Sequence, residues 1–257
     1  MMNLLRLEFR RLFRAKSFYI CLAISLVMII ISAATTKMLL NMASSEEFGE
    51  AFGSMLQTPT SFSLLKSTAS SSLTMVLAIF LSIFVTEDYT ADTIKNIYAK
   101  GHSRDSVFGA KIISAMTAGL IMILVSALFS FAAGKVMFGE VGTMGENYIG
   151  SVLAELVILL AYAALYFAIA IAFKKTGASI AVSILGPLLV GLLLSLGNAA
   201  LKSDKISLTD YWLDGRLTIL TQANVEGKEV LIGFIIGVVV LLVAGAVGFV
   251  VNRSSEQ

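Results

Sequence analysis

Long apolar runs separated by short polar segments dominate the hydropathy pattern of this chain. About 20 apolar residues, at a rise of 1.5 Å each, cross a hydrocarbon core of about 30 Å. Each of six stretches of 18 to 26 residues lacks Asp, Glu, Lys, Arg and His and is therefore long enough to be a transmembrane helix. The six stretches are 17–36, 67–86, 112–134, 156–173, 176–201 and 230–252.

We therefore expect an all-α membrane protein whose residues 1–257 form a single transmembrane domain. Only 14% of the residues are charged and 57% are hydrophobic, which leaves too little polar surface to dissolve six such helices. The expected spans are about 17–38, 67–86, 110–134, 151–173, 176–198 and 230–252. The connections are then 39–66, 87–106, 135–150 and 199–229, and none is long enough for a separate soluble core.

Basic residues are unevenly distributed between the two sides of this arrangement. If the N-terminus is inside, the internal segments hold 12 of the 19 Lys and Arg residues, although they are much shorter in total than the external ones. Such a bias is typical of the cytoplasmic side of membrane proteins. It predicts that both termini are cytoplasmic and that 39–66, 135–150 and 199–229 are external.

Residues 4–16 are predicted to form an amphipathic helix before the first span. At 100° per residue, four apolar side chains share one face and three arginines lie on the adjacent face. The apolar residues are Leu5, Phe9, Leu12 and Phe13, and the arginines are Arg6, Arg10 and Arg14. We favour a helix that lies flat in the interface with its arginines on anionic headgroups; a simple topology signal is the alternative.

Two further features fall in or near the external connections. Tyr211 and Trp212 lie among apolar residues in a segment too apolar for a solvated loop and too charged for a span. We expect this segment to be partly re-entrant or interfacial, with a structural anchor as the favoured role and an external gate as the alternative. A short interfacial helix is also expected after Ser44, because Ser44-x-x-Glu47 suits a helix N-cap.

Within the spans, Pro187 predicts a kink in the fifth helix, since it removes an amide donor. Glu155 is the only ionisable candidate at membrane depth, where an ion-coupled transporter needs such a group. It lies only about four residues, or ~6 Å, beyond a helix start near Ser151. An interfacial carboxylate capped by a neighbour is therefore the favoured interpretation, and an ion site is the alternative.

The polar positions contain none of the common catalytic motifs. Gly-x-x-x-x-Gly-Lys-Ser/Thr, His-Glu-x-x-His and Gly-x-Ser-x-Gly are all absent. His102 is the only histidine and Cys21 the only cysteine, which argues against a metal or disulfide site. We expect no catalytic residue and no metal site in this chain. Any catalytic activity would then be supplied by another chain.

The loop 87–106 can form a short helix of its own. Thr90 or Asp92 can cap the start of this helix, and Gly101 can end it. Its apolar side chains would share one side: Ile94, Ile97 and Tyr98. From the residues alone two interpretations stay open: the helix only fills the loop, or it docks onto a cytosolic partner.

The order of these features resembles the permease subunits of type-2 ATP-binding cassette exporters. The shared motif is Glu-x-x-x-x-x-Thr-Ile-Lys-Asn from Glu87, then Gly-x-Ser-Arg ending at Arg104, then Lys111 at the next span. The resemblance is closest to small stand-alone permeases of bacterial peptide, bacteriocin-immunity and antibiotic-resistance exporters. It covers the whole chain in topology and 87–111 in motif. The family pattern usually has a glycine where this chain has Asp92.

The resemblance implies a coupling helix, residues 93–99, that enters a groove on a separate phosphate-loop ATPase subunit. The coupling residues would be Glu87, Thr93, Ile94, Lys95, Ile97 and Tyr98. The partner would bind ATP and Mg²⁺, so this chain would need no cofactor of its own. A second permease copy or a sibling would face this one, membrane lipids would surround both, and nucleic acid is not expected as a partner.

The expected function is thus that of an exporter permease in the bacterial plasma membrane. It would move an amphipathic peptide or a hydrophobic compound out of the cell or membrane. Two alternatives stay open: an ion-coupled secondary transporter that depends on Glu155, and a membrane anchor or sensor subunit that transports nothing.

Overall fold

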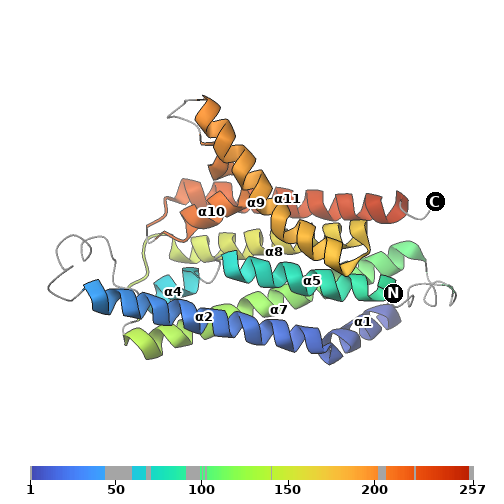
Figure 1. The fold of residues 1–257 in the computed structure, drawn as a ribbon, viewed down its shortest axis with the longest axis horizontal. Helices are drawn as coiled ribbons and strands as arrows, with labels where there is room; N and C mark the ends of the chain where they lie inside the picture. The colour runs from blue at the N-terminus through green and yellow to red at the C-terminus, as the bar shows by residue number, and fades with distance from the viewer. Residues whose placement is uncertain are drawn as a thin grey trace.

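Six long helices form the body of the protein (Figure 1). The computed structural model describes residues 2–43, 60–67, 71–90, 99, 101, 103–139, 141–201, 207–222 and 224–254. The long helices are α2 (Lys16–Ala43), α5 (Ser71–Thr90), α7 (Arg104–Phe138), α8 (Tyr148–Phe173), α9 (Thr176–Leu201) and α11 (Gly227–Ser254). Each is long and apolar enough to cross a membrane. Within the described residues, which contain no strand, the expected all-α membrane fold with six spans is confirmed.

Four shorter elements complete the described chain: α1 (Met2–Arg14), α4 (Ser61–Ser67), the 3₁₀ helix η1 (Leu208–Tyr211) and α10 (Leu213–Leu220). Several helices extend beyond the charge-free runs. Thus α5 continues to Thr90 and α7 begins at Arg104, which shortens the connection 87–106 from both ends. The interfacial helix expected after Ser44 lies outside the described residues.

The central helix of the bundle is α8, which contacts α5, α7, α9, α10 and α11. Small residues allow this close packing, since Ala154, Ala161 and Ala164 are all buried on α8. α11 approaches α8 most closely at Gly237, where an added Cβ would lie 2.9 Å from Val157 Cγ1. The glycine therefore has a packing role in this helix pair.

The described chain begins and ends at the same end of the bundle (Figure 1). α1 lies there and packs against α7, and the C-terminal end of α11 lies there too. The opposite end holds α4 and α10. We call the first of these the termini end of the bundle and the second the far end.

α9 changes direction along its length and leaves the other helices, as expected for a helix with Pro187 inside it (Figure 1).

The face of α1 that packs on the bundle is made by Leu4, Glu8 and Leu12, because that face meets α7. Phe13, on the predicted apolar face, is 50% exposed. Exposure of an apolar side chain is compatible with a helix in the membrane interface, and the interfacial position of α1 stays a prediction.

Candidate functional site

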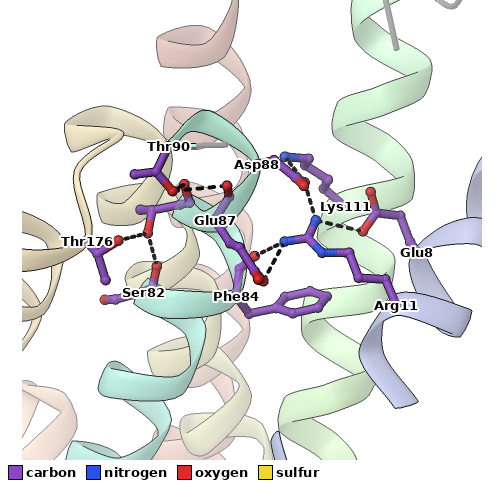
Figure 2. A network of polar contacts seen from close by, with 10 residues as sticks. Glu8, Arg11, Ser82, Phe84, Glu87, Asp88, Thr90, Lys111 and Thr176 are labelled. Atoms are coloured by element: carbon purple, nitrogen blue, oxygen red, sulfur yellow. Dashed lines mark hydrogen bonds and ion pairs between the residues drawn. The ribbon is translucent and has the colours of Figure 1, made fainter. Parts of the chain in front are cut away.

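A cluster of five charged side chains joins α1, the last turns of α5 and the start of α7 (Figure 2). This charged cluster consists of Glu8, Arg11, Glu87, Asp88 and Lys111. It lies at the termini end, where α5 ends and α7 begins. The cluster therefore connects three elements around the short segment between α5 and α7.

Arg11 lies at the centre of the charged cluster. Its Nη2 donates to the carbonyl oxygen of Phe84 at 2.9 Å and to Glu87 Oε2 at 3.1 Å. Its Nη1 forms an ion pair with Asp88 and lies 3.8 Å from Glu8 Oε2. The guanidinium carbon lies 5.1 Å from the centre of the Phe84 ring. Arginine suits this position because its planar fork presents several fixed donors at once.

Lys111 connects the other side of the cluster to α7. Its Nζ lies 2.6 Å from Asp88 Oδ2, and only 4% of Lys111 and 6% of Asp88 are exposed. The same Nζ lies 4.8 Å from the centre of the Tyr89 ring, which the Nζ of Lys174 approaches to 5.5 Å. Removing one partner of such a buried pair costs far more than the pair itself contributes, because the other charge stays buried.

Glu8 sets the balance of charge in the cluster. It is only 2% exposed. Burial raises the pKa of its carboxyl above the usual value of 4.5, and the nearby Asp88 carboxylate raises it further. Since the cluster holds three carboxylates and two cations, a proton on Glu8 makes it neutral.

The last turn of α5 is fixed by threonine hydroxyls as well as by charges (Figure 2). Thr86 Oγ1 donates to the Ser82 carbonyl oxygen at 2.6 Å and lies 2.7 Å from Thr176 Oγ1, on α9. Thr90 Oγ1 lies 3.0 Å from the carbonyl oxygen of Glu87, to which it donates. Beyond the segment, Ser103 caps α7 by accepting a hydrogen bond from the Ser106 amide at 3.4 Å. Both flanks of residues 91–102 are therefore held in place.

The predicted coupling residues divide between the described and the undescribed chain. Glu87 lies in the last turn of α5, where it accepts from Arg11. Thr93, Ile94, Lys95, Ile97 and Tyr98 lie outside the described residues, so their role in coupling stays a prediction.

The predicted interfacial arginines do not belong to the charged cluster. Arg6, Arg10 and Arg14 are exposed on α1, and their contact with lipid headgroups stays a prediction. The sequence reasoning missed Glu8, Arg11 and Asp88. One signal was present for Glu8, since it is the only carboxylate among the first 45 residues.

Glu155 lies at the far end of the bundle beside a second buried charge. It is 4% exposed, and Lys66 of α4 is 2% exposed. Lys66 Nζ donates to the carbonyl oxygen of Gln222 at 2.8 Å and lies 5.4 Å from the centre of the Tyr148 ring. Burial lowers the pKa of Lys66, and the Glu155 carboxylate raises it in part. Glu155 thus interacts with a fixed cation, while a functional role for it stays a prediction.

Tyr211 and Trp212 lie at the junction of η1 and α10. Tyr211 is 57% exposed, and its ring lies 5.3 Å from the guanidinium carbon of Arg216, which forms an ion pair with Glu229. α10 is packed against α8 and α11 through its buried leucines: Leu213, Leu217 and Leu220. The segment packs at the far end, and both its favoured role as a structural anchor and its alternative role as an external gate stay predictions.

The comparisons with known proteins agree with the helical architecture. The family model described as ABC-2 family transporter protein matches residues 4–190, from α1 through the charged cluster into α9. No curated protein and no solved structure matches the chain. Because the family model spans well over half of the sequence, the chain belongs to the ABC-2 family of transporter proteins and is a membrane permease of that family.

Proposed function

We propose that this permease is the membrane-spanning subunit of an ATP-driven exporter whose ATPase is a separate subunit. The observation that carries the proposal is the charged cluster, which attaches both flanks of residues 91–102 to α1. A segment that transmits movement from a cytosolic partner needs rigid attachment to the spans, because a loose loop would absorb the movement.

In this proposal the ATPase takes residues 91–102 into a groove on its surface and binds ATP and Mg²⁺ itself. Ile94 and Ile97 supply the apolar contact in that groove, and Asp88 and Lys111 pass its movement to α5 and α7. Arg11 extends the same attachment to α1. The termini end of the bundle then faces the cytoplasm.

The proposed cargo is an amphipathic peptide or a hydrophobic compound that leaves the cell or its membrane. Cargo of this kind enters from the bilayer, and the long helices present large apolar side chains to it: Leu188, Leu192 and Leu196 of α9 are all exposed. A second permease, identical or a sibling, completes the path. We place the assembly in the bacterial plasma membrane, with lipids around the remaining apolar surface.

Co-purification tests this function directly. The tagged chain is purified in mild detergent from its native host, and mass spectrometry identifies any bound phosphate-loop ATPase. We expect the ATPase with the wild-type chain and a loss of about tenfold or more with the double variant Ile94→Asp/Ile97→Asp, because two carboxylates cannot enter an apolar groove unpaired. Ser254→Asp, an exposed position at the end of α11, is the matched control and should retain the ATPase.

Two results would contradict the proposal at different levels. An ATPase recovered equally well with the double variant would remove residues 91–102 from the docking site. Absence of an ATPase from the wild-type chain under several detergents would overturn the exporter class itself and favour an ion-driven carrier.

A further inference from the structure

A cavity of about 720 Å³ opens between α5, α9 and α10. Its lining includes Pro187 and Gly191 of α9, the helix that leaves the others along its length (Figure 1). A Cβ added to Gly191 would meet no atom within 4 Å. No described side chain fills the space beside Gly191, and the cavity volume falls in the range of pockets that hold drug-sized ligands.

The described lining of this cavity is amphipathic. Apolar side chains form part of the wall, among them Met75, Leu188 and Leu217. Residues with hydroxyl groups form another part, including Tyr166 and Thr218. Among the described lining residues, Asp214 is the only one that carries a charge.

The carboxylate of Asp214 is positioned by a buried tyrosine and still accessible. Tyr162 is fully buried, and its hydroxyl donates to Asp214 Oδ1 at 2.5 Å. Asp214 itself is exposed, and within the described part of the chain it forms no ion pair. A carboxylate that pairs with no cation of the described residues therefore faces the cavity.

Tyr166 also lines the cavity but offers no open ring face. Only 3% of it is exposed, and its ring stacks on Tyr162, with the ring centres 5.7 Å apart and the planes at 28°. Recognition of charge therefore rests on Asp214. An anionic compound would be repelled by this carboxylate, and a cationic compound would be attracted.

We infer that this cavity binds the cargo, that the cargo carries a positive charge on an apolar body, and that Asp214 selects for that charge. Amphipathic amines and peptides with cationic side chains belong to this class. That the bound ligand is the transported cargo rests on the proposed function. Binding of the ligand itself needs no ATPase. A ligand of this class places its cation beside Asp214 and its apolar body against Leu188 and Met75.

Binding of lipophilic ions of equal shape and opposite charge tests the inference. The purified chain in nanodiscs of zwitterionic lipid is titrated with radiolabelled tetraphenylphosphonium, and separately with tetraphenylborate, after subtraction of empty nanodiscs. We expect Asp214→Asn to weaken binding of tetraphenylphosphonium by about threefold to fivefold, which corresponds to the loss of one partly exposed ion contact. Asp214→Glu should retain most of the affinity. Asp210→Asn, on η1 and outside the cavity lining, is the matched control and should leave the affinity unchanged.

A variant with the opposite charge gives an independent check. Thr221→Lys places a cation in the cavity wall. It should weaken the binding of tetraphenylphosphonium and strengthen the binding of tetraphenylborate. Equal affinity of wild type and Asp214→Asn for the cation would overturn the inference, as would an equal loss with Asp210→Asn. Since neither probe needs the ATPase, such a failure would leave the co-purification result, and with it the proposed function, intact.

Discussion

Arg11 of α1 and Asp88 of α5 form an ion pair that attaches the N-terminal helix to the second span where that span ends. The same carboxylate accepts Lys111 from the start of the third span. Asp88 is therefore shared by two cations from two different elements.

Arg11→Gln should destabilise the protein and weaken coupling. The variant leaves Asp88 with Lys111 alone and removes the donors to Phe84 and Glu87. Loss of a hydrogen-bonded charge in a largely buried site costs about 1.5–3 kcal/mol. Thermal unfolding in detergent checks the stability, and the ratio of transport to ATP hydrolysis checks the coupling.

Arg10→Gln is the matched control, because Arg10 is the neighbouring arginine on the exposed face of α1. Its expected effect on the free energy of unfolding is within about 0.5 kcal/mol, as for most surface substitutions. Equal melting temperatures for the two variants would contradict a central role for Arg11.

The losses of stability caused by Asp88→Asn and Lys111→Met should not be additive. Asp88→Asn leaves the buried Lys111 without its ion-pair partner, which costs about 3–5 kcal/mol, whereas Lys111→Met leaves Asp88 paired with Arg11 and costs less. We expect the double variant to be more stable than the sum of the single losses predicts, with a coupling of about 0.5–3 kcal/mol in a double-mutant cycle. Additive losses would show that the two side chains do not depend on each other.

Glu8 gives the cluster a dependence on pH. Its pKa is raised in the folded protein, by burial first and by Asp88 second, so the folded state binds the proton more tightly than the unfolded state. The stability that this proton contributes is fully present below pH 4.5 and is lost as the pH rises through the folded pKa. Melting temperatures of wild type and Glu8→Gln across this range measure the effect.

Glu8→Gln keeps the size of the side chain and removes its titration. We expect the variant to match the wild type at low pH and to be the more stable of the two at neutral pH. If the melting temperatures of wild type and Glu8→Gln changed in parallel over the whole pH range, Glu8 would have the same pKa in the folded and the unfolded state.

Cysteine labelling tests the predicted orientation. In a Cys21→Ala background, cysteines at Ser45 and Ser207 should react with an impermeant thiol reagent from outside the cell, and one at Ser254 should not. Ser207 lies in the connection at the far end, and Ser254 ends α11. Labelling of Ser254 alone would place the charged cluster outside the cell and so exclude contact with a cytosolic ATPase.

The sequence was sufficient for the spans because the absence of charge over about 20 residues has one dominant physical explanation. It was insufficient for the helix ends. Glu87 and Asp88 continue α5 because Arg11 and Lys111 neutralise them, and that pairing depends on tertiary contacts. The periodicity of α1 likewise could not show that Arg11 rather than Arg10 binds the end of α5. The cavity beside Asp214 could not be expected either, since it depends on where α9 and α10 lie relative to each other.

Glu155→Gln separates ATP-driven export from transport driven by an ion gradient. In the structure Glu155 and Lys66 are both buried, and Glu155 partly offsets the lowering of the Lys66 pKa that burial causes. Among the described residues Glu155 forms no ion pair. Glu155→Gln keeps the size of the side chain, so we expect it to change the melting temperature little and to leave ATP-driven transport active. An ion-coupled carrier would behave differently: Glu155→Gln would abolish transport at unchanged stability, and an ionophore that collapses the gradient would stop the wild-type protein. Transport into inverted membrane vesicles, with and without ATP and with and without the ionophore, distinguishes the two mechanisms.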